Sequence, residues 1–264
     1  MVELVAIDLD GTLLTSEKTI TTRTLRVMRA LRGQGIKIVI ASARPPRSVA
    51  ESYRLLGLDT CVICYNGALI YDPPTRRVLF HQPIDKFLAR EVIDTARQHY
   101  AEVLVSVEVL DHWYTDRFNP QYQTEVSKQF EPDQVGPVDT WLLQDVTKIL
   151  LLGPEKRIGE IRRKVIRRFR TRLAMTHSES SLLQIMSSGV SMGAAMERVC
   201  QHYGIPLQRT IAIGDSLNDA DMLAVAGVGI AMASAPEKVK RSADYITSGN
   251  DNEGVAEALE RFAL

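Results

Sequence analysis

Apolar, strand-sized segments alternate with helical segments at both ends of the chain, and this alternation constrains the fold more than any other feature. Near the N-terminus we expect strands at 4–7, 36–41 and 61–65, with helices near 21–31 and after Pro45. The strands are almost continuous apolar runs, as expected for parallel strands that are covered on both faces. The pattern predicts an α/β fold with a doubly wound parallel sheet.

The regular alternation of strands and helices stops in the middle of the chain, from about residue 84 to residue 186. Strands outnumber helices there: we expect helices near 85–99 and 155–169, and strands at 103–108, 113–115, 148–152, 172–176 and 182–186. The strand–helix alternation then returns, with a helix at 192–203 and strands at 210–213, 229–232 and 245–247. The sequence therefore predicts a parallel-sheet domain that is interrupted by a smaller α+β domain.

Two carboxylates, Asp8 and Asp10, follow the first strand and precede Gly11. Residues i and i+2 of an extended segment leave the backbone on the same side, so both side chains can converge at the carboxyl end of the strand. Like charges so close together are tolerated mainly when a cation lies between them or one of them holds a proton. The pattern is typical of a metal-assisted site in which the first carboxylate attacks phosphorus and the second transfers a proton.

A second acidic pair, Asp215 and Asp219, follows the strand at 210–213. Ligands of open parallel sheets bind at the carboxyl ends of the strands, so this pair can join Asp8 and Asp10 around one hard cation. An all-oxygen site favours Mg²⁺. The alternative interpretation makes Asp219 a helix cap and Asp215 a turn residue.

A third strand of the predicted sheet ends in Ser42, Ala43 and Arg44. Its hydroxyl and guanidinium groups suit the oxygens of a phosphate. For Arg44 the alternative is an ordinary surface ion pair.

Composition narrows the possible partners. The chain has 32 Lys plus Arg and 32 Asp plus Glu, so its formal net charge is zero and no long-range field favours nucleic acid or an anionic membrane. The one basic cluster, on the helix at 155–169, is expected to be a solvated face. The strand-like start lacks a signal peptide, and we expect a soluble, cytoplasmic protein. The cysteines, Cys61, Cys64 and Cys200, are expected to be buried packing residues.

The chain resembles the haloacid dehalogenase-like hydrolases, and within them the Cof-type phosphatases with an inserted α+β cap. The likeness covers nearly the whole length and rests on several ordered motifs. These are DxDGT from Asp8, a TGR-like segment at 42–44, the turn at 66–68, GDxxND from Gly214 to Asp219, the pair Ala231 and Met232, and the segment 252–256. The resemblance implies a Rossmann-like core at 1–82 and 187–264, with a cap domain at 83–186.

The resemblance also implies roles for the acidic residues. Asp8 would be the nucleophile that forms an aspartyl-phosphate. Asp10 would protonate the leaving oxygen and then activate water, while its backbone carbonyl helps to hold Mg²⁺. Asp215 would bind the metal directly, and Asp219 would support it through water or through groups around the direct ligands. Among the polar residues, Ser42 and Arg44 would bind the phosphoryl group and Asn218 would orient the phosphate or the substrate.

One position departs from the family pattern. Similar proteins place a lysine near the start of the helix after the cap, in a segment like Gly-Val-Ser-Lys-Gly, where this chain has Met192. A lost charge-assisted contact in such a site commonly costs several powers of ten in rate. Three explanations stay open: another cation (Arg44, Arg198 or Lys238) replaces it, the chain is an altered version of an active enzyme, or it has lost most catalysis and kept ligand binding.

The predicted function is that of a Mg²⁺-dependent phosphatase, which hydrolyses small phosphorylated metabolites such as sugar phosphates through Asp8. The first alternative is a weakly active or inactive phosphate-ligand binding protein, because of Met192. The second is a phosphosugar mutase. The expected partner is a small phosphorylated molecule rather than nucleic acid or a membrane, and we expect a monomer or a small homo-oligomer.

Overall fold

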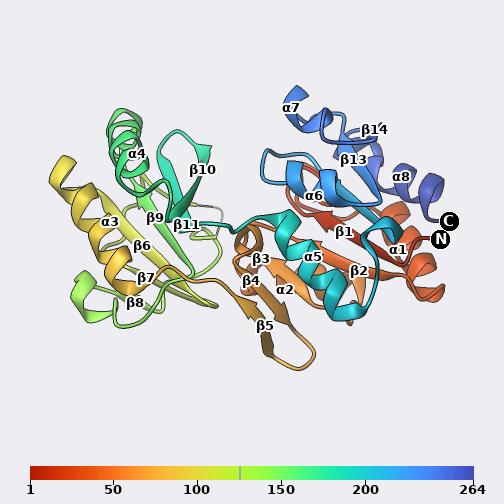
Figure 1. The fold of residues 1–264 in the computed structure, drawn as a ribbon, viewed down its shortest axis with the longest axis horizontal. Helices are drawn as coiled ribbons and strands as arrows, with labels where there is room; N and C mark the ends of the chain where they lie inside the picture. Colours follow the sequence, from red (N-terminus) through yellow and green to blue (C-terminus); the bar gives the residue numbers. More distant parts are fainter. Residues whose placement is uncertain (125) are drawn as a thin grey trace. The chain divides into compact units, whose positions relative to one another are not determined.

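The chain folds into two compact units. The computed structural model describes residues 1–124 and 126–264, apart from the side chains of residues 177–179. One unit comprises Met1–Phe80 and Ser191–Leu264, and the other comprises His81–Val190 (Figure 1). We call them the core unit and the inserted unit. The core unit thus contains segments from both ends of the described chain.

The core unit is built on an eight-stranded sheet with the order β14-β13-β12-β1-β2-β3-β4-β5. The predicted strands are present and run parallel: β1 (Leu4–Asp8), β2 (Lys37–Ala41), β3 (Val62–Cys64), β12 (Thr210–Gly214), β13 (Val228–Met232) and β14 (Tyr245–Thr247). Two further strands, β4 (Leu69–Asp72) and β5 (Arg77–His81), extend one edge, and β4 is antiparallel to β3. The pattern does not predict them because β5 is mostly exposed and lacks a buried apolar run.

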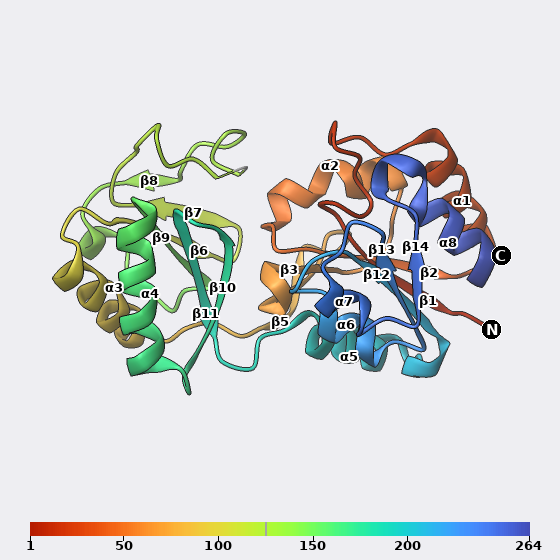
Figure 2. The same cartoon turned by 90° about the horizontal axis from the view of Figure 1, so that it is seen from above.

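Helices cover both faces of this sheet. Figure 2 shows α1 (Thr22–Gly33), α2 (Pro46–Leu56) and α8 (Gly254–Phe262) on one side, and α5 (Met192–Tyr203), α6 (Ala220–Val225) and α7 (Glu237–Lys240) on the other. All five residues of β1 are buried, as expected for a central strand between two helical layers. The three cysteines are buried and free, and burial raises the pKa of Cys61 and of Cys200 to about 11.

The inserted unit pairs a six-stranded sheet with two helices. The strand order is β10-β11-β9-β6-β7-β8, and α3 (Lys86–His99) and α4 (Glu155–Phe169) pack in one apolar cluster with the sheet. The basic side chains of α4 lie on its exposed face, whereas Ile158, Ile161 and Val165 are buried. The strands are β6 (Leu104–Val109), β7 (His112–Thr115), β8 (Gln134–Val135), β9 (Lys148–Leu152), β10 (Leu173–Glu179) and β11 (Leu182–Ser187).

The predicted fold class, an α/β core with an inserted α+β unit, is confirmed. None of the helices in the described parts of the chain combines the length and apolar character that a membrane-spanning helix needs. Short 3₁₀ helices connect several elements: η1 (Tyr65–Gly67), η2 (Val138–Thr140), η3 (Leu207–Arg209) and η4 (Asn250–Asn252).

The register of the central strands brings their carboxyl ends together. Asp8 at the end of β1 is paired with Ala41 at the end of β2, and Ile7 is paired with Ile213 of β12. The segments that follow these three strands therefore start at the same edge of the sheet. All the predicted site residues belong to these ends or to the segments directly after them.

Candidate active site

Three carboxylates converge at this edge. Asp8, Asp215 and Asp219 each offer one oxygen, and these oxygens lie within 4.8 Å of one another. Asp8 ends β1, while Asp215 and Asp219 lie in the turn between β12 and α6. The side chains are poorly solvated, since Asp8 is 8% exposed and Asp219 is 0% exposed. The first acidic motif and the second are thus joined in one cluster.

Asp219 is held by the turn that contains it. Its Oδ2 accepts hydrogen bonds from the backbone N–H of Asp215 at 3.1 Å, and from the N–H and hydroxyl of Ser216 at 2.8 and 2.9 Å. Its Oδ1 is buried and has no hydrogen-bond partner among the described residues. A buried carboxylate oxygen without a donor is a place for a cation or an ordered water. The side chain is not used as an N-cap of α6.

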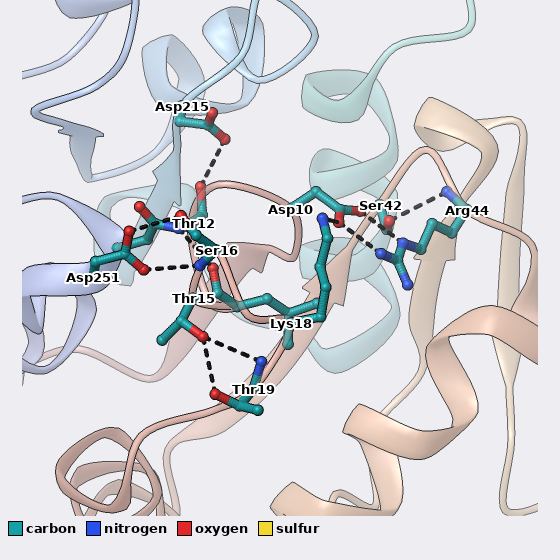
Figure 3. A network of polar contacts seen from close by, with 12 residues as sticks. Asp10, Thr12, Thr15, Ser16, Lys18, Thr19, Ser42, Arg44, Asp215 and Asp251 are labelled. Carbon is teal, nitrogen blue, oxygen red and sulfur yellow. Dashed lines mark hydrogen bonds and ion pairs between the residues drawn. The ribbon is translucent and has the colours of Figure 1, made fainter. Parts of the chain in front are cut away.

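Two glycines allow the acidic segments to approach each other. Gly11 has φ +81°, and a Cβ at this position would lie 2.4 Å from Oδ2 of Asp215. A Cβ at Gly214 would lie 2.5 Å from the Cβ of Asp219. Next to Gly11, the Thr12 hydroxyl donates to Oδ1 of Asp215 at 3.0 Å and fixes that carboxylate (Figure 3). A larger residue at either glycine would push the carboxylates apart.

The electrostatics of the cluster favour a cation. Burial, followed by the charges of Asp219, Asp215 and Asp10, raises the pKa of Asp8 well above its ordinary value. Burial also raises the pKa of Asp219 to about 6 and raises that of Asp215. Two buried carboxylates and one half-buried carboxylate, with an unsatisfied oxygen on Asp219, are a donor set that fits a hard divalent cation such as Mg²⁺.

Asp10 is bound by two cations instead of joining the three carboxylates. Arg44 donates from Nε to Oδ2 and from Nη2 to Oδ1, both at 2.6 Å, and Lys18 donates from Nζ to Oδ1 at 2.7 Å (Figure 3). Burial acts to raise the pKa of Asp10, but the hydrogen bonds and charges of Arg44 and Lys18 outweigh it and lower the pKa. Arg44, which was expected to bind phosphate, contacts Asp10 here.

The remaining predicted residues lie at the same sheet edge. Ser42 follows β2 and is 1% exposed, and its hydroxyl oxygen accepts a hydrogen bond from the N–H of Arg44 at 3.2 Å. Asn218 is half-buried in the turn that carries Asp215 and Asp219. Its N–H donates to the Ser216 hydroxyl oxygen at 3.3 Å.

The turn η1 lies between β3 and β4 in the chain, and it contacts both the segment after β2 and the start of α5. Tyr65, Asn66 and Gly67 all have positive φ, at 53°, 55° and 98°. A Cβ at Gly67 would lie 2.2 Å from the carbonyl oxygen of Ser191, so only glycine allows this approach. The N–H of Asn66 donates to the carbonyl of Ser42 at 3.1 Å. The head of α5 is therefore packed against the turn that supports the Ser42 segment.

Met192 is the first residue of α5 and part of the apolar core. Its side chain is 1% exposed and belongs to a cluster with residues of β1, β2, β3 and α6. Of the three cations considered as substitutes, Arg44 reaches Asp10, Arg198 lies 4.0 Å from the ring centroid of Phe80, and Lys238 is exposed on α7.

Sequence reasoning missed Lys18, which follows the DxDGT motif in a segment without periodicity.

The comparisons identify the family. The sequence profile of the haloacid dehalogenase-like hydrolases matches residues 5–259. The chain is also similar over its length to two Bacillus subtilis proteins. Phosphatase YwpJ is 31% identical over 296 residues, 98% of this chain and 99% of the relative, and 5-amino-6-(5-phospho-D-ribitylamino)uracil phosphatase YitU is 28% identical over 270 residues, 98% and 97% of the two chains. The chain therefore belongs to the haloacid dehalogenase-like hydrolases.

Comparison of the fold with solved structures supports the same family. A haloacid dehalogenase-like hydrolase from Bacteroides thetaiotaomicron superposes with a TM-score of 0.89, at 27% identity over 99% of both chains. The family predicted from the motifs and the predicted enzyme class, a phosphoric monoester hydrolase, are both confirmed.

The acidic cluster has a consequence for stability that can be measured. The metal-free protein is expected to become less stable as the pH rises from about 4 to 6, because Asp219 has an ordinary pKa of 3.8 and a folded-state pKa of about 6. In this window the folded state holds a proton that the unfolded state has released, so the free energy of unfolding falls with rising pH. At about 1.4 kcal/mol per pKa unit, the loss from Asp219 is on the order of 2–3 kcal/mol.

Thermal unfolding midpoints in EDTA at pH 4, 5, 6 and 7 would measure this dependence. Asp219→Asn should flatten it, because the amide does not titrate. Mg²⁺ should raise the midpoint at pH 7, since a cation bound only by the folded state stabilises that state. Asp94→Asn, a change at an exposed position of α3, is the control. Equal pH slopes in the wild type and Asp219→Asn would contradict the expectation.

Proposed function

We propose that this protein is a Mg²⁺-dependent phosphatase that hydrolyses small phosphorylated metabolites, sugar phosphates or similar compounds, through an aspartyl-phosphate on Asp8. The observation that carries the proposal is the convergence of Asp8 with Asp215 and Asp219 at the carboxyl ends of β1 and β12. A lone acidic pair suits many sites, but three carboxylates gathered at one point suit a site that holds a metal cation, which neutralises an anionic group while one of the carboxylates attacks it. YitU, a relative named for a small phosphorylated substrate, supports this substrate class.

In the proposed reaction an Asp8 oxygen attacks the phosphorus of the ester, and the bond to the leaving oxygen breaks. Asp10 gives its proton to that oxygen, which leaves as an alcohol. Asp10 then takes a proton from water, whose oxygen attacks the phosphorus of the aspartyl-phosphate. Inorganic phosphate leaves, and the Asp8 carboxylate and the Asp10 proton are restored. The acid role requires the Asp10 carboxyl to leave its ion pair with Arg44 and Lys18.

Other residues of the chain hold the reacting groups. Asp8, Asp215 and Asp219, with the backbone carbonyl of Asp10, would hold Mg²⁺, which when bound neutralises charge on the phosphoryl group. The Ser42 hydroxyl and the Arg44 guanidinium would donate to phosphoryl oxygens, and Asn218 would orient the phosphate or the substrate.

The inserted unit is proposed to act as a cap, with domain boundaries at 83 and 186 and a core at 1–82 and 187–264. A cap that covers the site during the reaction excludes water and adds contacts to the part of the substrate beyond the phosphate. A cytoplasmic location, a monomeric or small homo-oligomeric state, and the lack of nucleic-acid or membrane partners remain predictions.

A panel of phosphoesters tests the proposed function. The purified protein would be incubated with sugar phosphates, nucleoside monophosphates and pyridoxal phosphate in Mg²⁺, and released inorganic phosphate would be measured. We expect release from at least one sugar phosphate, its loss in EDTA and its recovery when Mg²⁺ is added back.

Two other outcomes would favour the alternatives. Ligand-induced stabilisation without turnover would indicate a phosphate-ligand binding protein. Met192 favours this alternative because it stands where similar proteins have a lysine. Isomerised sugar phosphate without free phosphate would indicate a phosphosugar mutase.

A further inference from the structure

With a phosphoryl group bound, the site would hold more negative charge than one divalent cation can balance. Asp8, Asp215 and Asp219 present three carboxylates within 4.8 Å. A phosphoryl group adds about 1.5 to 2 negative charges. A single divalent cation cannot balance that sum. This inference rests on the proposed function: an anionic phosphoester substrate needs positive side chains close to the carboxylates.

Two positive side chains, Arg44 and Lys18, converge on Asp10. Together they carry more positive charge than is needed to neutralise one carboxylate. Arg44 binds both oxygens of Asp10, and its side chain is only 13% exposed. Lys18 contacts Oδ1, the oxygen that Nη2 of Arg44 already binds, and its side chain is 49% exposed. Because the bidentate contact with Arg44 is sufficient to neutralise Asp10, Lys18 is a surplus cation with one bond to give up.

The loop that carries Lys18 is built to direct this side chain. The backbone N–H of Thr15 donates to the carbonyl of Thr19 at 2.9 Å, and their hydroxyls lie 2.9 Å apart. Ser16 donates from its N–H and its hydroxyl to Asp251 at 2.8 and 2.7 Å. Lys18 itself has φ +60°, a conformation that a lysine keeps only where its surroundings impose it. Figure 3 shows its side chain running from this loop to Asp10.

We propose that Lys18 is a substrate-binding residue that exchanges Asp10 for a phosphoryl oxygen of the substrate, and that it supplies the positive charge which position 192 lacks. Met192 is buried in the apolar core and brings no charge. Arg198 is occupied with the ring of Phe80. Lys18 moves to the phosphoryl group while the substrate binds, and Arg44 holds Asp10 until the carboxyl leaves the ion pair to transfer its proton.

The first test removes the charge and keeps the length of the side chain. Lys18→Met is expected to raise both the KM for p-nitrophenyl phosphate and the inhibition constant of inorganic phosphate by about tenfold or more, the typical value of a hydrogen bond to a charged group. Lys18→Arg, which restores the charge, should recover most of both values. Lys240→Met, which removes an ion pair between a half-buried lysine and the exposed Glu237 on α7, should leave both unchanged. Unchanged constants in Lys18→Met would overturn the proposal.

The second test asks whether Lys18 takes the place of a charge at position 192. In the Met192→Lys background, Lys18→Met should have a smaller effect than in the wild type, because two cations would serve the same phosphoryl group. Effects of equal size in the two backgrounds would contradict the replacement of a charge at position 192.

Calorimetric binding of inorganic phosphate in the presence of Mg²⁺ separates this inference from the proposed function, since it needs no turnover. The wild type could bind phosphate without hydrolysing any ester, while Lys18→Met loses this binding. That outcome would support the role of Lys18 and refute the phosphatase proposal. Equal binding by both proteins would overturn the role of Lys18 whether or not the protein is an enzyme.

Discussion

Asp8→Asn is expected to abolish turnover and, in the absence of metal, to make the protein more stable. The amide cannot attack phosphorus, and the loss of a nucleophile typically reduces turnover by a factor on the order of 10⁴ or more. The gain in stability follows from the buried carboxylate, because burial and three neighbouring aspartates raise its pKa. An amide removes this repulsion without changing the shape of the side chain.

Steady-state turnover and thermal unfolding in EDTA would be measured on the same preparations. Asp94→Asn removes an exposed carboxylate of α3 and should leave both quantities unchanged. Residual turnover in Asp8→Asn close to the wild-type rate would refute the role of Asp8 as nucleophile. A lower unfolding temperature in EDTA would show that the carboxylate is stabilised by contacts other than those described.

Met192→Lys is expected to raise turnover by roughly tenfold to a hundredfold, at or below the factor of about 10²–10³ that one hydrogen-bond donor contributes in a catalytic site. The same change should lower the unfolding temperature, because position 192 is 1% exposed and lies in an apolar cluster where a charge is costly. The gain in rate is smaller than the full value of such a contact if Lys18 already contributes positive charge. Turnover and unfolding temperature together separate the two effects.

The matched control is Met196→Lys. Met196 lies one turn further along α5, is 0% exposed and belongs to the same apolar cluster. It should lose stability without any gain in turnover. If Met192→Lys loses as much stability as this control and gains no rate, position 192 does not face the reacting phosphoryl group.

The parallel strands of the core are predictable because their physical cause is local. Five consecutive buried residues in β1 and the apolar runs of β2 and β12 can be recognised without knowing their neighbours. Strands β4 and β5 are different, because their place at the sheet edge depends on pairing. The apolar part of β4 is short, with only Leu69 and Ile70 buried, and most side chains of β5 are exposed.

The acidic cluster is predictable for a related reason. Asp8 and Asp215 each follow a strand, and the carboxyl ends of parallel strands meet at one edge. The ion pairs of Asp10 are not predictable in this way. Lys18 reaches Asp10 through a loop with a left-handed residue, and that geometry leaves no periodic signal in the sequence. The apolar surroundings of Met192 likewise depend on how α5 packs against β1 and η1.

The order of synthesis gives the split core unit a consequence for folding. Thr12 and Asp215, which are joined by a hydrogen bond in the site, are 203 positions apart in the chain. At about 5–20 residues per second, a ribosome needs roughly 10–40 s to cover that distance. The inserted unit, continuous from His81 to Val190, can be complete in that time while β1 still lacks β12 as its neighbour. A nascent chain therefore exposes one edge of β1 and has no assembled site until β12, Asp215 and Asp219 have been made.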